Sequence, residues 1–353
     1  MKEEIVYRRK FLALALGALS VVGAIALAAE PSYADAKKPF VALANAYYGN
    51  SWRHELVEEF VKAADKAKAD GKISDYVVVN GDGTVTQQIA QLSDLILKKP
   101  DLIIIDAASE TALNGVIEKA CSQGIVVLTF DGVATAPCAY RLRSTFSFHE
   151  QLAENVIKLM GGKGNLLVIR GLSGTTPDIE QYDYQMKAVK RHPDVKIVGT
   201  VYGGWSTSVS QAAVTNILPT LPHVDGVVSQ GGGDEFGAAR AFDLFGGDYA
   251  QHPPVIGGGG SSDFLAWWSD RAGKSDYKTI SMSTDPASVV AALWYGLDIL
   301  NGKIKPDKTT EVHIPALTIT QDELSKYKDL PPSRVVTSDV YTPEWVEKTL
   351  ESH

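Results

Sequence analysis

Polar and aromatic side chains recur directly after short apolar runs of this sequence. In the first half of the chain these residues are Asn50, Trp52, Arg53, Asp106 and Asp131. Carboxylates, amides and a guanidinium form strong hydrogen bonds with hydroxyl groups, and flat aromatic rings cover the apolar faces of a sugar ring. Together these residue types predict a binding site for a neutral molecule with several hydroxyl groups. We expect Asp131 and Trp52 to contribute ligand affinity and not stability.

A second set of such residues follows the apolar runs of the second half. It consists of Asp178, Gln181, Tyr182, Trp205, Gln230, Asp234 and Asp263. Each of them also has an ordinary structural explanation, since an aspartate after a strand often caps the next helix and most large aromatic residues are largely buried. Because the set recurs at the same end of several runs, the sequence favours one shared ligand site.

Catalytic and metal-binding motifs are missing from the sequence. The seven histidines lack the spacing of metal ligands, and no Gly-x-Ser-x-Gly motif occurs. The glycine runs at 231–233 and 257–260 do not complete the dinucleotide pattern Gly-x-Gly-x-x-Gly, because Phe236 and Asp263 stand where its last glycine belongs. We therefore expect a binding protein and not an enzyme, without a metal or a cofactor.

The apolar runs themselves have the pattern of parallel strands. They are rich in Val, Ile and Leu without strict alternation, as expected when both faces are covered. The predicted strands are 40–45, 76–80, 102–106, 125–131, 165–170, 195–202, 224–230, 255–258 and 278–283. The predicted helices are 54–69, 87–98, 111–121, 182–191, 209–218, 235–245, 264–270 and 342–350. Two successive strand-helix-strand series predict an α/β fold with two Rossmann-like lobes. In such sheets, ligands bind beyond the carboxyl ends of the strands.

The first 36 residues have the pattern of a cleaved secretory signal peptide. Basic residues at 8–10 precede an apolar run at 11–29, and Ala34-Asp35-Ala36 fits a signal-peptidase site. The length of that run also suits a membrane anchor, which the clear cleavage site disfavours. We expect the mature protein to begin at Lys37, without lipid, in the periplasm. Residues 8–12 (RRKFL) also fit a twin-arginine signal, so Sec and twin-arginine export both stay open.

Composition limits the partners of the chain. Its net charge of −8 and the absence of a basic run argue against nucleic acid, and 353 residues are enough for two lobes with separate cores. The two cysteines, Cys121 and Cys138, are a candidate disulfide in an oxidising compartment. The alternative is two buried free thiols.

Several short motifs carry a family resemblance. They are 49–53 (GNSWR), 86–89 (TQQI), 108–113 (ASETAL), 130–131 (FD) with 137–139 (PCA), 170–171 (RG) with 174–175 (GT), and 229–231 (SQG). From about residue 38 to about residue 320, the sequence resembles the ribose-binding type of periplasmic sugar-binding protein, the solute receptors of ABC importers with the type I fold.

The resemblance implies two lobes joined by three hinge segments, near 142–145, 281–285 and 312–317. The first lobe would comprise 38–144 plus 284–312, and the second 145–283 plus 313–353. It also implies that the protein is a monomer that captures a monosaccharide or related polyol between the lobes and delivers it to an ABC permease in the inner membrane. The family's ligand contacts after its strands correspond to Asn50, Trp52, Arg53, Asp106, Asp131 and Trp205.

The sequence departs from the ribose-binding pattern at two places. Gln181 stands where that pattern has an arginine, with Asp178 and Tyr182 nearby, and a glycine replaces the aspartate expected after a glycine-run strand, with Asp263 a few residues on. The sugar therefore stays open between ribose, another monosaccharide and a sugar alcohol. Two other functions also stay open: an exported sensory sugar receptor and an exported oxidoreductase with a nucleotide cofactor.

Overall fold

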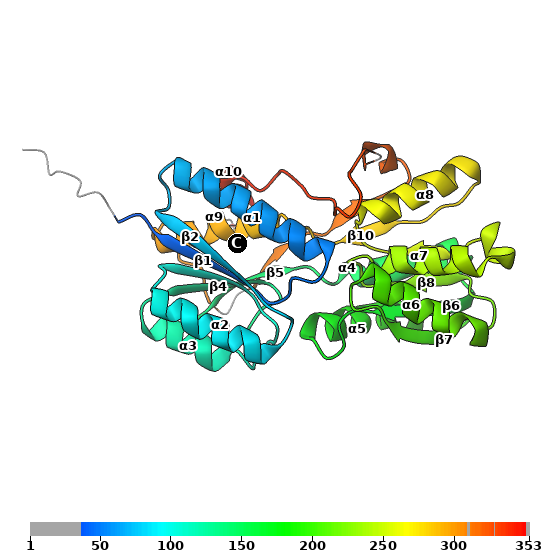
Figure 1. Cartoon of the computed structure of the whole chain (residues 1–353), viewed down its shortest axis with the longest axis horizontal. Helices are drawn as coiled ribbons and strands as arrows, with labels where there is room; N and C mark the ends of the chain where they lie inside the picture. Colours follow the sequence, from blue (N-terminus) through cyan, green and yellow to red (C-terminus); the bar gives the residue numbers. More distant parts are fainter. Residues whose placement is uncertain (1–36, 309–310, 328, 351–353) are drawn as a thin grey trace, which may run out of the picture. The chain divides into compact units, whose positions relative to one another are not determined.

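The chain forms two parallel β-sheets with helices on both faces (Figure 1). The structure is a computed structural model that describes residues 37–308, 311–327 and 329–350. The predicted signal peptide at 1–36 lies outside the described residues. Within them, no helix is both long enough and apolar enough to cross a bilayer.

The first sheet has the strand order β11-β5-β4-β3-β1-β2, and all its neighbours are parallel. Its strands are β1 (Phe40–Asn45), β2 (Asp75–Asn80), β3 (Leu102–Asp106), β4 (Val126–Asp131), β5 (Tyr140–Ser144) and β11 (Glu311–Ile314). The helices around it are α1 (Ser51–Ala69), α2 (Val85–Lys98), α3 (Asn114–Ser122) and α9 (Ser288–Leu300). Val41 and Leu43 of β1 face α1 and α9, whereas Ala42 and Ala44 face α2 and α3. Burial on both faces explains why the strands read as continuous apolar runs.

The second sheet has the order β7-β6-β8-β9, again with parallel neighbours. Its strands are β6 (Gly164–Arg170), β7 (Val195–Tyr202), β8 (Gly226–Val228) and β9 (Val255–Gly257). The helices around it are α4 (Phe148–Leu159), α5 (Thr176–Lys190), α6 (Thr207–Ile217), α7 (Asp234–Phe245) and α8 (Ser262–Lys274). The remaining elements are the antiparallel pair β10 (Ser281–Ser283) and β12 (Leu317–Ile319), the 3₁₀ turns at 218–220, 247–250 and 324–327, and α10 (Pro343–Thr349).

The nine predicted strand positions and eight predicted helix positions are all occupied by elements of the predicted type. Five strands and α-helices were not predicted, namely β5, α4, α9, β11 and β12. The largest boundary error concerns α5, which begins at Thr176 and not at residue 182. Thr175 caps this helix by accepting a hydrogen bond from the Asp178 backbone N–H, and Pro177 occupies its first turn, where proline is well tolerated.

The chain passes between the two sheets four times, once more than expected. The first three passages join β5 to α4, β10 to α9, and β11 to β12. In the fourth, Val336 belongs to the core of the second sheet, whereas Tyr341 and Val346 belong to that of the first. We call the first sheet with α1–α3, α9 and α10 the first lobe, and the remaining elements the second lobe.

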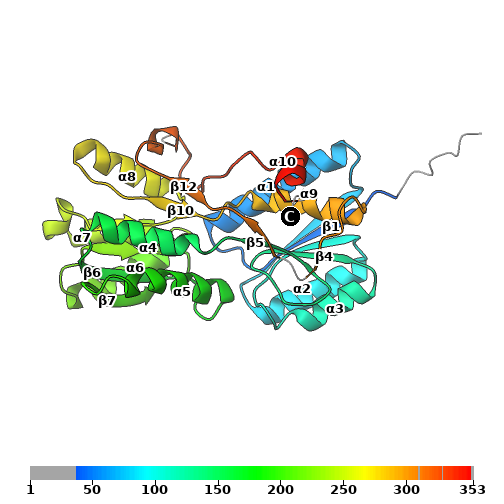
Figure 2. The ribbon, with the colours of Figure 1, turned by 180° about the vertical axis from the view of Figure 1, so that it is seen from behind.

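The expected assignment of residues 313–353 to the second lobe is therefore wrong in part. Strand β11 continues to Ile314 within the first sheet. The apolar residues Val346 and Leu350 belong to the core of the first lobe. Helix α10 lies beside α9, as the view from behind shows (Figure 2). Burial of apolar surface decides this placement, because α10 is too short to be stable alone.

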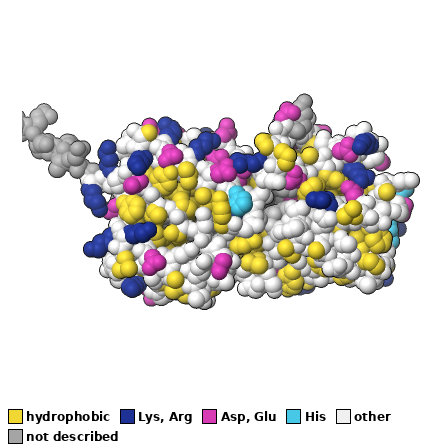
Figure 3. Space-filling view, viewed as in Figure 1, with side chains coloured by type: hydrophobic (Ala, Val, Ile, Leu, Met, Phe, Trp, Pro, Cys, Tyr) yellow, Lys and Arg dark blue, Asp and Glu magenta, His cyan; other side chains and the backbone are white. Residues whose placement is uncertain are grey.

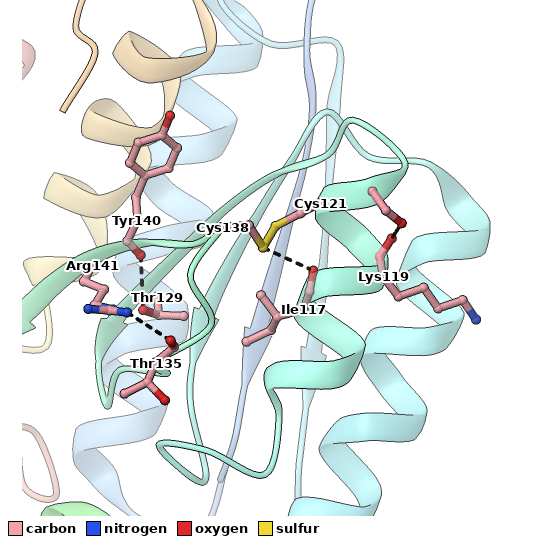
Figure 4. Close-up of a disulfide and its surroundings, with 9 residues drawn as sticks. Ile117, Lys119, Cys121, Thr129, Thr135, Cys138, Tyr140 and Arg141 are labelled. Carbon is pink, nitrogen blue, oxygen red and sulfur yellow. Dashed lines mark hydrogen bonds between the residues drawn. A yellow bond between two sulfur atoms is a disulfide. The ribbon is translucent and has the colours of Figure 1, made fainter. Parts of the chain in front are cut away.

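Cys121 and Cys138 form a disulfide between the end of α3 and the segment that leads into β5 (Figure 4). Their Cα atoms are 6.3 Å apart. In the same segment Arg141 donates to the Thr135 carbonyl at 3.1 Å. In the loop-entropy description, closing a loop of this size contributes roughly 3 kcal/mol.

Charges are mixed on the face shown in Figure 3, where basic and acidic side chains lie beside one another. An extended surface of one sign, which nucleic-acid binding requires, is not seen on this face of the described residues.

The buried carboxyl of Asp285 makes the stability of the protein depend on pH. It lies in the second passage, where Oδ1 accepts from the Ala287 backbone N–H at 2.9 Å and Oδ2 from that of Ser338 at 3.1 Å. Burial raises its pKa to about 7. Since this value lies above that of an unfolded aspartate, about 3.9, the folded state binds more protons between these two values. The contribution of the Asp285 carboxyl to the free energy of unfolding is therefore fully present below about pH 4 and is lost as the pH rises through about 7.

We expect Asp285→Asn to remove this pH dependence. Between pH 4.5 and pH 8, the wild type should lose up to about 3 kcal/mol more unfolding free energy than the variant. Urea unfolding of both proteins across this range measures the difference. Parallel pH profiles for the two proteins would contradict the assignment to Asp285.

Candidate functional site

A buried cavity lies beyond the carboxyl ends of strands from both sheets. Its volume is about 60 Å³. The residues that line it are Asn50, Trp52, Arg53, Asp131, Phe146, Phe148, His149, Pro177, Gln181, Trp205, Gln230, Gly232, Ser283 and Thr284. Seven of the twelve predicted site residues belong to this set: Asn50, Trp52, Arg53, Asp131, Gln181, Trp205 and Gln230. The sequence therefore predicted the place of the cavity and half of its wall.

The start of α1 directs two side chains into the cavity. Asn50 caps this helix, since its side-chain oxygen accepts from the Arg53 backbone N–H at 2.9 Å. Trp52 and Arg53 therefore leave the first turn of the helix at fixed positions. The guanidinium of Arg53 lies 4.9 Å from the centre of the Trp52 ring.

Arg53 forms an ion pair with Asp106 at the end of β3. Asp106 is only 1% exposed and does not line the cavity. Its carboxylate is turned toward Arg53, and its predicted contact with a ligand stays a prediction. The second carboxylate near Arg53 belongs to Asp131, whose Oδ2 is 3.9 Å from Nη2. The three side chains together carry one positive and two negative formal charges.

Asp131 is held at the end of β4 in a left-handed conformation, with φ at 54°. Burial raises the pKa of its carboxyl, while Arg53 and the Ser144 hydroxyl act in the opposite direction. Its Oδ1 atom has no hydrogen-bond partner among the described residues. An unpartnered buried acceptor costs about 1–3 kcal/mol, so this oxygen is available to a ligand.

Aromatic rings from both lobes form walls of the cavity. Trp205 follows β7, while Phe146 and Phe148 follow β5. Trp52 is 8% exposed and donates from Nε1 to the Thr284 carbonyl at 3.1 Å. Trp52 also belongs to the core of the first lobe. The expectation that it contributes affinity and not stability is therefore corrected, since one face of this residue is structural.

The side chain of Gln230 connects two loops of the second lobe by hydrogen bonds. Its Oε1 accepts from the Gly171 backbone N–H at 2.7 Å, and its Nε2 donates to the Asp178 carbonyl at 2.9 Å. Asp178 itself accepts two hydrogen bonds from Arg170, at 3.0 and 2.8 Å. The guanidinium of Arg170 also lies 4.3 Å from the Tyr182 ring centre. Asp178 and Tyr182 therefore hold Arg170 and do not line the cavity, contrary to prediction.

Two further predicted aspartates lie outside the cavity wall. Asp234 is fully buried at the start of α7, and its Oδ1 accepts from the Ser206 backbone N–H at 3.0 Å. Asp263 lies in the first turn of α8, where it accepts from the Ser333 backbone N–H at 3.1 Å. Each carboxylate accepts from neighbouring backbone, while Oδ2 of Asp234 has no hydrogen-bond partner among the described residues. Their contact with a ligand stays a prediction.

Seven lining residues were not predicted, namely Phe146, Phe148, His149, Pro177, Gly232, Ser283 and Thr284. Most of them lie in or beside passages between the lobes. The predicted hinge segments at 142–145 and 281–285 could therefore have indicated that residues in or beside them line the cavity.

His149 is the most informative of these residues. It is 1% exposed, and burial lowers its pKa to about 3, so the ring is neutral near pH 7. Its Nδ1 atom has no hydrogen-bond partner among the described residues, and neither has Oε1 of Gln181.

No group of three or more candidate ligands for a metal ion occurs in the described part of the chain.

The family model of the periplasmic binding protein domain matches residues 41–304. The chain belongs to this family. It is similar to the crystal structure of an ABC transporter solute binding protein from Thermobispora bispora, with 36% identity and a TM-score of 0.81, covering 89% of this chain and 95% of that one. The two-lobe type I fold predicted from the sequence is thus confirmed.

Two curated relatives are more distant. The D-apiose import binding protein of Actinobacillus succinogenes is 26% identical over 180 residues, which are 48% of this chain and 57% of the relative. The xylitol-binding protein of Mycolicibacterium smegmatis is 24% identical over 240 residues, 66% of each chain. The matches thus span about 60% of the relatives' lengths. These family members are binding proteins and not enzymes, and the family indicates a periplasmic or extracellular location.

Proposed function

We propose that this protein captures a monosaccharide or sugar alcohol in the cavity and delivers it to the permease of an ABC importer in the inner membrane. The observation that carries the proposal is the wall of the cavity, which contains Asp131 with an unpartnered oxygen, the guanidinium of Arg53 and the rings of Trp52 and Trp205. The relatives named for D-apiose and xylitol support the same ligand class.

The size of the cavity supports a small ligand. A volume of about 60 Å³ holds roughly four to six water molecules. One small polyhydroxylated molecule can replace such a group of waters, whereas an oligosaccharide or a dinucleotide requires much more room.

The unpartnered polar atoms support a ligand rich in hydroxyl groups. Asp131 belongs to the first lobe, while Gln181 and His149 belong to the second, and each has a buried atom without a partner in the described part of the chain. A hydroxyl both donates and accepts, so a polyol can satisfy atoms on both sides. A ligand that contacts both lobes binds their closed arrangement more tightly and shifts the equilibrium toward it.

Export and assembly belong to the same proposal. Residues 1–36 are removed as a signal peptide, by the Sec or the twin-arginine route, and the mature protein works as a monomer in the periplasm. N-terminal sequencing of periplasmic protein should begin at Lys37, and the mature protein should elute at the mass of one chain.

A thermal-shift screen with D-ribose, D-xylose, D-apiose and xylitol tests the proposed ligand class. A ligand at 100 times its Kd stabilises the folded state by about 2.7 kcal/mol. A nucleotide or flavin spectrum in the purified protein, together with no shift by any of these compounds, would instead favour the oxidoreductase alternative.

Asp131→Asn tests the site itself. Loss of a charged hydrogen-bond partner should raise Kd by a factor of about 10–100, equivalent to about 1.5–3 kcal/mol. The ligand-free melting temperature should not fall, because burial already disfavours the charged carboxylate. Asp94→Asn is the matched control, since it makes the same chemical change at an exposed position on α2. A Kd that changes equally in both variants, as measured by calorimetric titration, would show that Asp131 does not contact the ligand.

A further inference from the structure

Trp205 is held in an unfavourable backbone conformation at the cavity wall. Its φ is 55°, in the left-handed region that residues other than glycine rarely occupy. Such a conformation costs on the order of 1–3 kcal/mol and persists only where the surrounding structure enforces it. The neighbours of the loop at 203–206 must therefore supply this constraint.

Two glycines from other loops pack directly against Trp205. A Cβ atom at Gly171, after β6, would collide with the indole ring. A Cβ atom at Gly232, after β8, would lie 2.6 Å from Cβ of Trp205. These contacts limit where the ring can lie, and Gly232 also packs against the Trp205 backbone. Within the loop, the Ser206 N–H also donates to the Gly203 carbonyl at 3.1 Å.

The backbone of the loop is held by Asp234. Its Oδ1 accepts from the Ser206 backbone N–H at 3.0 Å, and the backbone N–H of Trp205 also faces this carboxylate. A Cβ atom at Gly203 would collide with Oδ1, so the loop closes tightly around the carboxylate. Asp234 is in turn fixed in α7, where its carbonyl accepts from the Ser210 hydroxyl at 2.8 Å.

We propose that Asp234 is a positioning residue of the ligand site, whose buried carboxylate holds the backbone of residues 205–206 and so fixes the Trp205 ring against the cavity. Asp234 does not touch the ligand. This inference rests on the proposed function for its effect on affinity, but its effect on Trp205 exists without a ligand. An acidic residue in the first turn also favours α7 through the helix dipole, and an experiment must separate the two roles.

Fluorine NMR of protein labelled with 5-fluorotryptophan makes this separation. The chain has six tryptophans, and Trp205→Phe assigns the signal of Trp205. In ligand-free Asp234→Asn, the Trp205 signal should shift or split while the other signals keep their positions. The Kd for whichever of xylitol, D-ribose, D-xylose or D-apiose the wild type binds should rise at least tenfold. Glu344→Gln, which changes an acid in the first turn of α10, should alter neither the Trp205 signal nor the Kd.

Asp234→Ser provides a second test if circular dichroism shows that Asp234→Asn is not folded, because serine replaces the carboxyl group by a shorter side chain with one hydroxyl. An unmoved Trp205 signal with weakened binding would make Asp234 a direct ligand contact and overturn the proposal. Equal changes in all tryptophan signals, or a moved Trp205 signal with unchanged Kd, would also overturn it. A moved Trp205 signal in a protein that binds none of the four compounds would support the positioning role and refute the proposed ligand class.

Discussion

Arg53→Met is expected to destabilise the ligand-free protein by about 3–5 kcal/mol, because removing one partner of a buried ion pair leaves the other charge uncompensated. The remaining charge is that of Asp106, which is 1% exposed at the end of β3. Asp131 loses its nearest cation in the same variant. Binding should weaken as well, since the guanidinium lines the cavity.

The double variant Arg53→Met/Asp106→Asn should recover much of the lost stability, because it removes both charges of the pair. Urea unfolding of the wild type, both single variants and the double variant gives the coupling energy directly. Arg191→Met is a suitable control, since its side chain is 49% exposed and pairs with Glu150 and Glu154 at the surface. That change should cost no more than about 1 kcal/mol. Equal losses at Arg53 and Arg191 would contradict the buried pair.

Trp52→Ala should reduce stability and affinity together, whereas Trp205→Ala should mainly reduce affinity. Trp52 is packed in the core of the first lobe, where replacing a tryptophan by alanine typically costs about 3–5 kcal/mol. Trp205 lies outside the hydrophobic cores and packs on glycine backbone at the cavity.

Ligand-free melting and calorimetric titration of the two variants distinguish these effects. A melting temperature that falls equally in both would mean that Trp205 is as structural as Trp52. An unchanged Kd in Trp205→Ala would remove this ring from the ligand site.

The strands that could be predicted are those buried on both faces. β3 (Leu102–Asp106) is an uninterrupted apolar run, and its residues are all buried. β5 was missed because Arg141 and Arg143 alternate with apolar residues. The side chain of Arg141 donates to the Ala134 carbonyl, which lies in an irregular segment. The side chain of Arg143 donates to Glu180, which is distant in sequence. The local sequence around β5 does not show that these partners exist, and so it does not predict a strand there.

The candidate site, too, could be predicted from the sequence only in part, because the partner of each side chain is set by the fold. Asp131 and Asp178 both follow strands and look alike in the sequence. Asp178 is neutralised by Arg170 at the end of its own lobe's strand β6, whereas one oxygen of Asp131 keeps no partner in the described residues. Residue type therefore predicted which side chains gather at the strand ends. Which carboxylate keeps an oxygen for a ligand depends on the direction in which each arginine side chain points.

The late position of β11 has a consequence for the order in which the chain folds during synthesis. The second sheet is continuous in sequence from β6 to β9 and is complete once residue 257 has left the ribosome. The first sheet lacks its edge until Glu311 pairs with Arg141, and it is covered by α10 later still. Contacts so distant in sequence form slowly, and an unpaired edge strand is a template for aggregation. We therefore expect a nascent chain with a complete second sheet and an open β5 edge, and this intermediate is the one that a molecular chaperone should bind.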